Sequence, residues 1–288
     1  MTEQERYFWD LTGYVVARNA LTETELERLN GAWEYCRAQI PDVEPGGGSR
    51  GSSSLSGKRG RFEFHGILGI DQPYCDAFRN LIAHPAVVSR LNVMCGPGFR
   101  LDHGPLIIPG EKGVEGFTLH GAGDPYKPRV AYHNQDGRIH CNGVTVSFQL
   151  GDCNAGDGGF ACVPGSHKSK YPLPEGVRTC DDDGGSVVQP PVKAGDILFF
   201  MDGAQTHGTL PWQSEKPRRV VLIKYAGRTA VRLHPKAETN LPEIWWDGDA
   251  VEDMNDVERA VMYGPGGRHG EAVGLDVDAH GQVCVGEL

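Results

Sequence analysis

The pattern of apolar and polar positions changes near Phe99. From there the chain contains short apolar runs, many of them rich in β-branched residues, separated by Gly, Pro and Asp turns. Such runs predict strands, and we place them at 100–108, 116–119, 144–150, 160–163, 186–190, 197–201 and 220–225. Seven or eight short strands with frequent turns predict a closed or sandwiched β-architecture.

Before Phe99 the apolar residues recur mostly at helical spacing. Thr22 and Glu25 form a capping-box pattern at the start of a predicted helix over 22–40. The segment 75–95 predicts a second helical region, broken at Pro85. Residues 6–16 predict a short strand entered through an aromatic cluster.

The segment 41–61 has no periodicity and is dense in Gly, Ser and basic residues. Its composition predicts a mobile loop outside the core. Two interpretations stay open. The loop is a tolerated surface insertion, or it is a lid whose arginines and Lys58 meet an acidic substrate when the site closes.

These elements predict one domain over 1–288. An N-terminal helical and lid region spans 1–97, a β-barrel core spans 98–228, and a C-terminal extension over 229–288 packs on the core with a helix near 251–262. A chain of this length is long enough to bury a full core.

Composition narrows the possible functions. The net charge of -10 and the pI near 5.5 argue against nucleic acid or an anionic membrane as partner. No apolar run is long enough to cross a bilayer, and the first ten residues do not form a secretory signal, so we expect a cytoplasmic protein. The eight cysteines form no CxxC pair, which favours reduced thiols over zinc sites or disulfides.

Candidate chemistry gathers in the segment GDILFFMDGAQTHGTLPWQSEKPRR, residues 195–219. The apolar run 197–201 ends just before His207, and the next run begins just after Arg218. If the two runs form a hairpin, His207 and Arg218 come to one mouth. A planar guanidinium can hold a carboxylate through two parallel hydrogen bonds.

A second segment, DGGFACVPGSHK at 157–168, precedes the first. Together the two segments resemble the phytanoyl-CoA dioxygenase family of iron(II)/2-oxoglutarate oxygenases, over about residues 85–228. The resemblance implies a mainly β fold with flanking helices, a double-stranded β-helix or jelly-roll, cupin-like barrel. It also implies that His207 is the distal iron ligand, while Arg218 and Thr209 hold the far carboxylate of 2-oxoglutarate.

In the segment that should supply the first two iron ligands, this sequence departs from the family's usual pattern. The family supplies a histidine and a carboxylate as HxD, and no HxD occurs between Phe99 and Ser166. We prefer His120 as the first ligand because it follows an apolar strand. In an HxD motif that began at His120, the carboxylate position would be occupied by Ala122. We therefore assign the carboxylate to Asp124, with Asp136 as the alternative.

Several other polar residues lie near the expected site. We interpret His133, His140 and His167 as structural, and His103 as a satisfied buried imidazole. The remaining candidates have no motif to support them: Asp102 for the substrate pocket, and Gln149 and Arg138 as contacts to 2-oxoglutarate or substrate.

The resemblance implies a dioxygenase that uses Fe(II), 2-oxoglutarate and O2 to hydroxylate or demethylate a small-molecule substrate, with release of succinate and CO2. Two alternatives remain: a non-oxidative metal-binding barrel of cupin type, and a halogenase, in which Gly or Ala replaces the carboxylate so that a halide can bind the iron. Whether the chain forms a homo-oligomer stays open.

Overall fold

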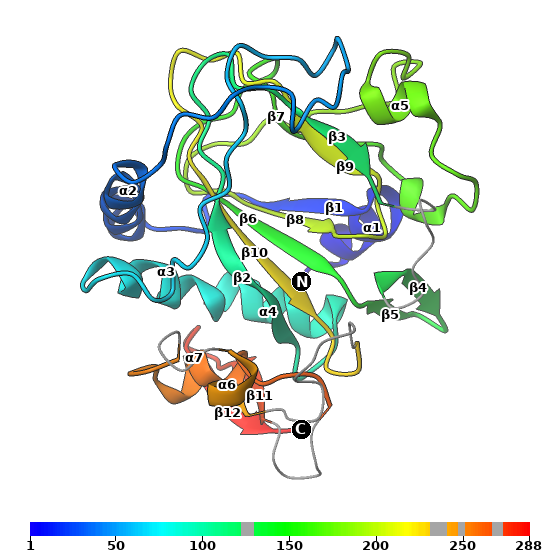
Figure 1. Ribbon diagram of the computed structural model, residues 1–288. Coiled ribbons are helices and arrows are strands. Elements are labelled where there is room, and N and C mark those ends of the chain that lie inside the picture. The colour runs from blue at the N-terminus through cyan, green and yellow to red at the C-terminus, as the bar shows by residue number, and fades with distance from the viewer. Residues whose placement is uncertain (122–129, 231–240, 247–250, 267–272) are drawn as a thin grey trace.

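Two antiparallel sheets form the centre of the computed structural model, which describes residues 1–121, 130–230, 241–246, 251–266 and 273–288. The larger sheet has the strand order β1-β8-β6-β10-β2 and the smaller one β3-β9-β7 (Figure 1). The sheets form a jelly-roll and do not close into a ring. Their strands are β1 (Tyr14–Ala17), β2 (Arg100–Ile107), β3 (Phe117–His120), β6 (Val144–Gln149), β7 (Gly159–Cys162), β8 (Ile197–Met201), β9 (His207–Leu210) and β10 (Val220–Ala226).

The two faces of the larger sheet differ in polarity. Alternate positions on β6, β8 and β10, such as Val146, Phe199 and Ile223, belong to the main hydrophobic core. Helices α2 (Glu23–Arg37), α3 (Tyr74–Ile82) and α4 (Pro85–Met94) supply the other side of this core, and α3 and α4 run beside the sheet in Figure 1. The intervening positions face the smaller sheet and include polar residues, which leaves room for a site between the sheets.

Local capping sets the helix boundaries. The predicted capping box of Thr22 and Glu25 is present at the start of α2, and Pro85 separates α3 from α4. The short strand predicted within 6–16 is present as β1 (Tyr14–Ala17), but the aromatic cluster before it belongs to helix α1 (Glu3–Thr12), which has its own capping box from Thr2. Gly13, with φ +83°, ends that helix, and β1 follows.

The connection between β8 and β10 also differs from the prediction. These strands are not a hairpin, because both pair with β6, which lies between them. The segment between them contributes β9 to the smaller sheet. The predicted strand over 186–190 is reduced to a single bridge between Val188 and Cys162.

A buried carboxylate and several backbone hydrogen bonds hold the segment 41–61 beside the smaller sheet; among the latter, Thr118 N–H donates to the Gly48 carbonyl and Gly116 N–H to the Leu55 carbonyl. Glu115 accepts hydrogen bonds from the backbone N–H groups of Gly46, Gly48 and Ser49, and from the Ser49 hydroxyl at 2.7 Å. Leu55 is fully buried. The expectation that this segment stays outside the core is therefore wrong.

The C-terminal part packs beneath the larger sheet (Figure 1). In place of one helix over 251–262, the structure has the short helix α7 (Asp256–Ala260). The remaining elements are β4 (Tyr132–Gln135), β5 (Arg138–Cys141), a 3-10 turn at Ser166–Lys168, α5 (Glu175–Thr179), α6 (Pro242–Trp245), β11 (Val273–Val277) and β12 (Val283–Glu287). Among the described residues, no helix has the length and apolar character needed to span a membrane.

Candidate active site

A cavity of about 220 Å³ lies between the two sheets. The wall from the larger sheet consists of Leu106, Thr145, Ser147, Phe200, Leu222 and Lys224. The wall from the smaller sheet consists of Phe117, His120, Phe160, His207, Gly208 and Thr209. The remaining lining residues are Arg61, Glu63, Ile108, Asp202 and Arg218. Apolar walls with a few convergent polar groups are typical of a small-molecule site.

His120 and His207 are directly opposite each other on β3 and β9. Their ring centroids are 4.4 Å apart. Nδ1 of His120 lies 3.1 Å from the Thr118 carbonyl oxygen, and Nδ1 of His207 lies 2.9 Å from that of Gln205. A carbonyl oxygen can only accept, so each Nδ1 carries the hydrogen and each Nε2 keeps its lone pair.

Burial keeps both rings neutral. Desolvation, with the nearby His120, lowers the pKa of His207 to about 3. Desolvation also lowers the pKa of His120, against the opposing effect of its hydrogen bond to the Thr118 carbonyl. Although Asp202 lies 3.6 Å from Nε2 of His207, the pair is therefore not an ion pair at neutral pH. Neutral imidazoles are the form that binds divalent transition metals.

A buried carboxylate lies beside the histidine pair. Asp202 follows the end of β8, and its Oδ1 is 3.4 Å from Nζ of Lys224. Within the described ranges, no three His, Cys, Asp or Glu side chains are already arranged to hold a metal ion. The two imidazoles therefore fit a metal, and the third ligand has to move into place or come from a residue outside those ranges.

Arg218 lines the same cavity. Its backbone N–H donates to the Gly110 carbonyl at 2.7 Å, but its guanidinium makes no hydrogen bond or ion pair to any residue that the structure describes. Burial, with Arg61 nearby, lowers the pKa of Arg218, which remains a cation at neutral pH. An uncompensated buried cation is costly, so this position favours an anionic ligand.

Thr209 and Arg61 line the same cavity as Arg218. Thr209 pairs with Phe117 on β3 and with Phe160 on β7, and it lines the cavity. Arg61, from the segment 41–61, stacks 4.8 Å from the Phe117 ring centroid and pairs with Glu63 at 2.5 Å. The segment 41–61 thus brings one of its arginines to the cavity, while Lys58 does not line it.

Two of the predicted residues cannot be placed. Ala122 and Asp124 lie outside the described residues. Asp136 is at the turn of the β4–β5 hairpin, and His133 and His140 pair with each other on its exposed strands. None of these three lines the cavity.

The remaining candidates also lie elsewhere. His167 is buried, and its Nε2 is 3.0 Å from the Asp10 carbonyl oxygen. Asp102 pairs with Arg100 and His103, each at 2.9 Å, outside the cavity. Gln149 bonds to Ser147 on its own strand, and Arg138 is exposed on the hairpin.

Sequence reasoning missed the cavity residues Asp202, Lys224, Thr145, Ser147 and Glu63. A weak signal exists for three of them. Thr145, Ser147 and Lys224 are polar residues at alternate positions of otherwise apolar strands, which indicates that one face of those strands lines something other than a hydrophobic core.

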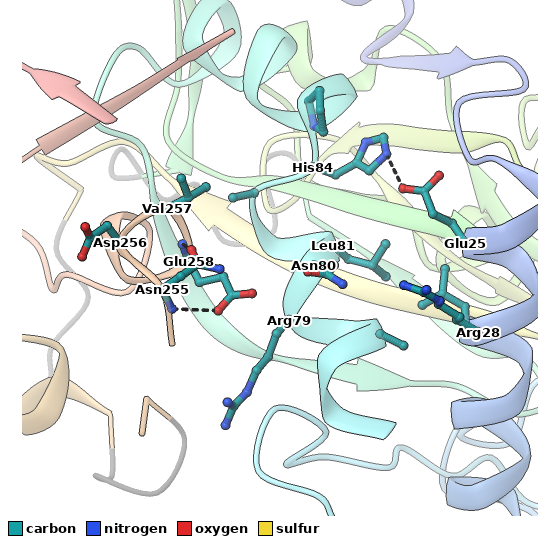
Figure 2. Close-up of a pocket in the computed structure, with 14 residues that line it drawn as sticks. Glu25, Arg28, Arg79, Asn80, Leu81, His84, Asn255, Asp256, Val257 and Glu258 are labelled. Atoms are coloured by element: carbon teal, nitrogen blue, oxygen red, sulfur yellow. Dashed lines mark hydrogen bonds and ion pairs between the residues drawn. The ribbon is translucent and has the colours of Figure 1, made fainter. Parts of the chain in front are cut away.

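A larger hollow, of about 640 Å³, lies between helices α2, α3, α4 and α7 (Figure 2). Two of its titratable groups already have partners. His84 lies 3.2 Å from Glu25, and the Glu258 carboxylate accepts from the backbone N–H of Asn255 as part of a helix cap. The smaller cavity has the histidine pair and the uncompensated arginine, which makes it the candidate active site.

Comparisons with known proteins give a consistent result. Residues 9–220 match the model of the phytanoyl-CoA dioxygenase (PhyH) family. No curated protein matches the chain.

Solved structures with a similar fold include HygX from Streptomyces hygroscopicus, determined with nickel, 2-oxoglutarate and hygromycin B. It is 20% identical with a TM-score of 0.63 over 79% of this chain and 88% of its own. The non-heme alpha-ketoglutarate-dependent epimerase SnoN from nogalamycin biosynthesis is 19% identical with a TM-score of 0.56, over 79% of this chain and 83% of its own. AviO1 from Streptomyces viridochromogenes Tue57 is 18% identical with a TM-score of 0.58, over 80% of this chain and 97% of its own.

Proposed function

The chain belongs to the phytanoyl-CoA dioxygenase family, and from this premise we propose that it oxidises a C–H bond of a small-molecule substrate, with 2-oxoglutarate and O2 as co-substrates. Hydroxylation is the direct outcome, and demethylation follows when the oxidised carbon is attached to nitrogen or oxygen. Succinate and CO2 are the co-products. The bound iron(II) and 2-oxoglutarate supply the oxidising chemistry, and the chain supplies binding, orientation and exclusion of water.

His120 and His207 hold the iron through their Nε2 atoms. The carbonyls of Thr118 and Gln205 fix the tautomer and the plane of each ring. Because both rings stay neutral, no proton has to leave before the metal binds. A carboxylate completes the protein ligands, and from the sequence Asp124 is a candidate for it.

Arg218 binds the far carboxylate of 2-oxoglutarate, with Thr209 beside it. The single observation that carries the proposal is this cavity, in which two neutral, facing imidazoles share one space with an uncompensated guanidinium. A non-oxidative cupin-type barrel has no need for that guanidinium. Phe117, Phe160 and Phe200 supply apolar walls, which reduce the water near the reacting carbon.

Binding of 2-oxoglutarate tests the proposal. We expect the anaerobic, iron-loaded protein to bind 2-oxoglutarate in calorimetry, and Arg218→Ala to weaken binding by about 100-fold. The matched control is Arg219→Ala, because the neighbouring arginine points to α2, where it bonds to Asn30 and Glu34. Equal affinity in wild type and Arg218→Ala would favour the cupin-type alternative.

The substrate needs a separate experiment. Polar lining groups such as Ser147, Glu63 and Lys224 support a small polar metabolite, and the hygromycin B complex of HygX makes polar natural products a sensible first panel. Succinate formation from 2-oxoglutarate should rise when the right class of compound is added. Product mass then distinguishes hydroxylation from demethylation.

A further inference from the structure

The carboxylate of the metal site has no counterpart at the usual HxD position. Among the described residues that line the cavity, Asp202 and Glu63 are the two carboxylates. Glu63 is paired with Arg61 at 2.5 Å. Asp202 is 7% exposed, and its Oδ1 lies 3.6 Å from Nε2 of His207, a separation that suits two ligands of one ion.

The backbone holds Asp202 firmly at that place. Its N–H donates to the Gly143 carbonyl at 3.0 Å, directly beyond the register pair of Met201 with Val144. The main chain is therefore fixed by β6, and only the short side chain has to rotate to change partners. A ligand on the end of a strand is positioned more reliably than one on a loop.

Lys224 pairs with the Asp202 carboxylate. It lies on β10, opposite Thr145 of β6, and its Nζ is 3.4 Å from Oδ1 of Asp202. A buried carboxylate needs a cation. A divalent ion bound between the histidines would replace Lys224 as the counter-charge of Asp202. Its two positive charges attract a carboxylate more strongly than one ammonium group does.

We propose that Asp202 supplies the carboxylate ligand of the metal site and that Lys224 is its counter-ion when the metal is absent. This inference rests on the proposed function, because it concerns the same iron. It assigns the ligand to the residue that follows β8 of the larger sheet, whereas His120 and His207 both come from the smaller sheet.

The proposal predicts that substitutions of Asp202 and Lys224 change the metal affinity in opposite directions. Titration with cobalt(II) sulfate in chloride-free buffer should show binding at least about 100-fold weaker in Asp202→Asn. Lys224→Met removes the competing cation, so binding should become about fivefold tighter, the scale of one ion pair. The cobalt(II) absorption spectrum should change in Asp202→Asn, because the coordination changes, and keep its wild-type form in Lys224→Met.

The matched control is Asp196→Asn, at the other end of β8. Asp196 is also buried, and its carboxylate pairs with Arg18 outside the cavity. This variant should lose thermal stability and keep its cobalt affinity. The control shows what a loss of stability alone does to cobalt affinity. A loss of affinity that occurs in Asp202→Asn and not in Asp196→Asn therefore supports ligation by Asp202.

Several outcomes would overturn the inference. One is wild-type affinity and spectrum in Asp202→Asn, together with a loss in Asp124→Asn, which would assign the ligand to Asp124. Another is an unchanged Asp202→Asn in which added chloride alters the cobalt spectrum, as a halide-binding site without a carboxylate would require. In both cases 2-oxoglutarate still binds to the metal-loaded wild type, so the proposed function survives. Absence of metal binding in wild type would overturn both proposals.

Discussion

The side-chain nitrogens of single residues determine how the cavity responds to pH. His207 has a pKa of about 3 because burial and the neighbouring His120 oppose its charged form. In the unfolded chain the same ring has an ordinary pKa near 6.5. Acid therefore protonates the unfolded chain first, and the ring opposes folding as the pH falls.

This difference gives a stability prediction. The contribution of neutral His207 is fully present above about pH 6.5 and is lost as the pH falls toward about 3, by up to about 1.4 kcal/mol per pH unit. Urea unfolding of the metal-free protein between about pH 7 and about pH 4 should therefore show a shallower fall for His207→Gln than for wild type. Identical slopes would mean that the ring is not held neutral.

The sequence was enough to select some residues of the site and not others. His207, Arg218 and Thr209 belong to a motif with fixed spacing, so a resemblance could locate them before the fold was known. Asp202 carries no local signal, and the polar position of Lys224 on an apolar strand gives only a weak one. Their proximity depends on the pairing of β6 with both β8 and β10, which is a long-range property of the sheet.

The pairing of β3 with β9 sets the distance between the two histidines. Gly208 follows His207 on β9, and a Cβ atom at this position would lie 2.6 Å from the carbonyl oxygen of Phe117 and 2.9 Å from the Leu119 side chain. The strands can approach each other only because this residue has no side chain.

Gly208→Ala should consequently force β9 away from β3. We expect a loss of about 1–3 kcal/mol of stability and weaker metal binding, since the ring pair opens with the strands. Gly104→Ala is the control, because a Cβ at that position of β2 meets nothing within 4 Å. Cobalt titration and urea unfolding measure the two effects, and equal behaviour of the two variants would contradict the argument.

Glu115 anchors the segment 41–61 through hydrogen bonds to its backbone. Its pKa is lowered to about 2, because four hydrogen bonds from Gly46, Gly48 and Ser49 outweigh its desolvation. The stability it supplies is therefore present above about pH 4.5 and lost as the pH falls toward about 2.

Removal of this anchor has a local signature. Glu115→Ala leaves buried donors without an acceptor, which should cost about 3 kcal/mol. We expect much faster proteolytic cleavage within 41–61 and slower succinate formation, because Arg61 loses its support. Glu111→Ala removes an exposed partner of Arg37 and should change neither. Cleavage at the wild-type rate in Glu115→Ala would show that other contacts hold the loop.

Elements with local determinants were predicted well. The α2 helix carries its capping box in the sequence, and Pro85 divides α3 from α4 as expected. The strand β1 lies within the range predicted for it, but helix α1 before it was missed, although Thr2 and Glu5 carry its capping box. The supposed hairpin of β8 and β10 failed because β6 lies between them, and no local pattern reveals a third strand.

At the scale of the whole molecule, the C-terminal residues complete the fold. The Val261 carbonyl accepts from the backbone N–H of Leu101 on β2, and the Glu252 carbonyl accepts from Arg79 on α3. Val251, Met262 and several neighbours belong to the main core. This extension is thus continuous with the sheet and helices that carry the cavity.

Deletion of residues 229–288 should therefore expose apolar surface on β2 and α4. We expect a truncated chain that is aggregation-prone or unfolds at a much lower temperature, whereas the full chain should unfold in one cooperative transition. Calorimetry and size-exclusion chromatography test this. A truncated chain that stays monomeric with an unchanged melting temperature would show that the extension is an independent unit.

The division of the cavity between two sheets has a mechanical consequence. The facing imidazoles belong to the three-stranded sheet, while Arg218 and Lys224 belong to the five-stranded sheet or its approach. When a metal ion and 2-oxoglutarate are bound, they would link the three-stranded sheet to the five-stranded sheet. Ligands in the cavity would then slow the separation of the two sheets during unfolding. They would therefore lengthen the lifetime of the folded enzyme as well as enable its turnover.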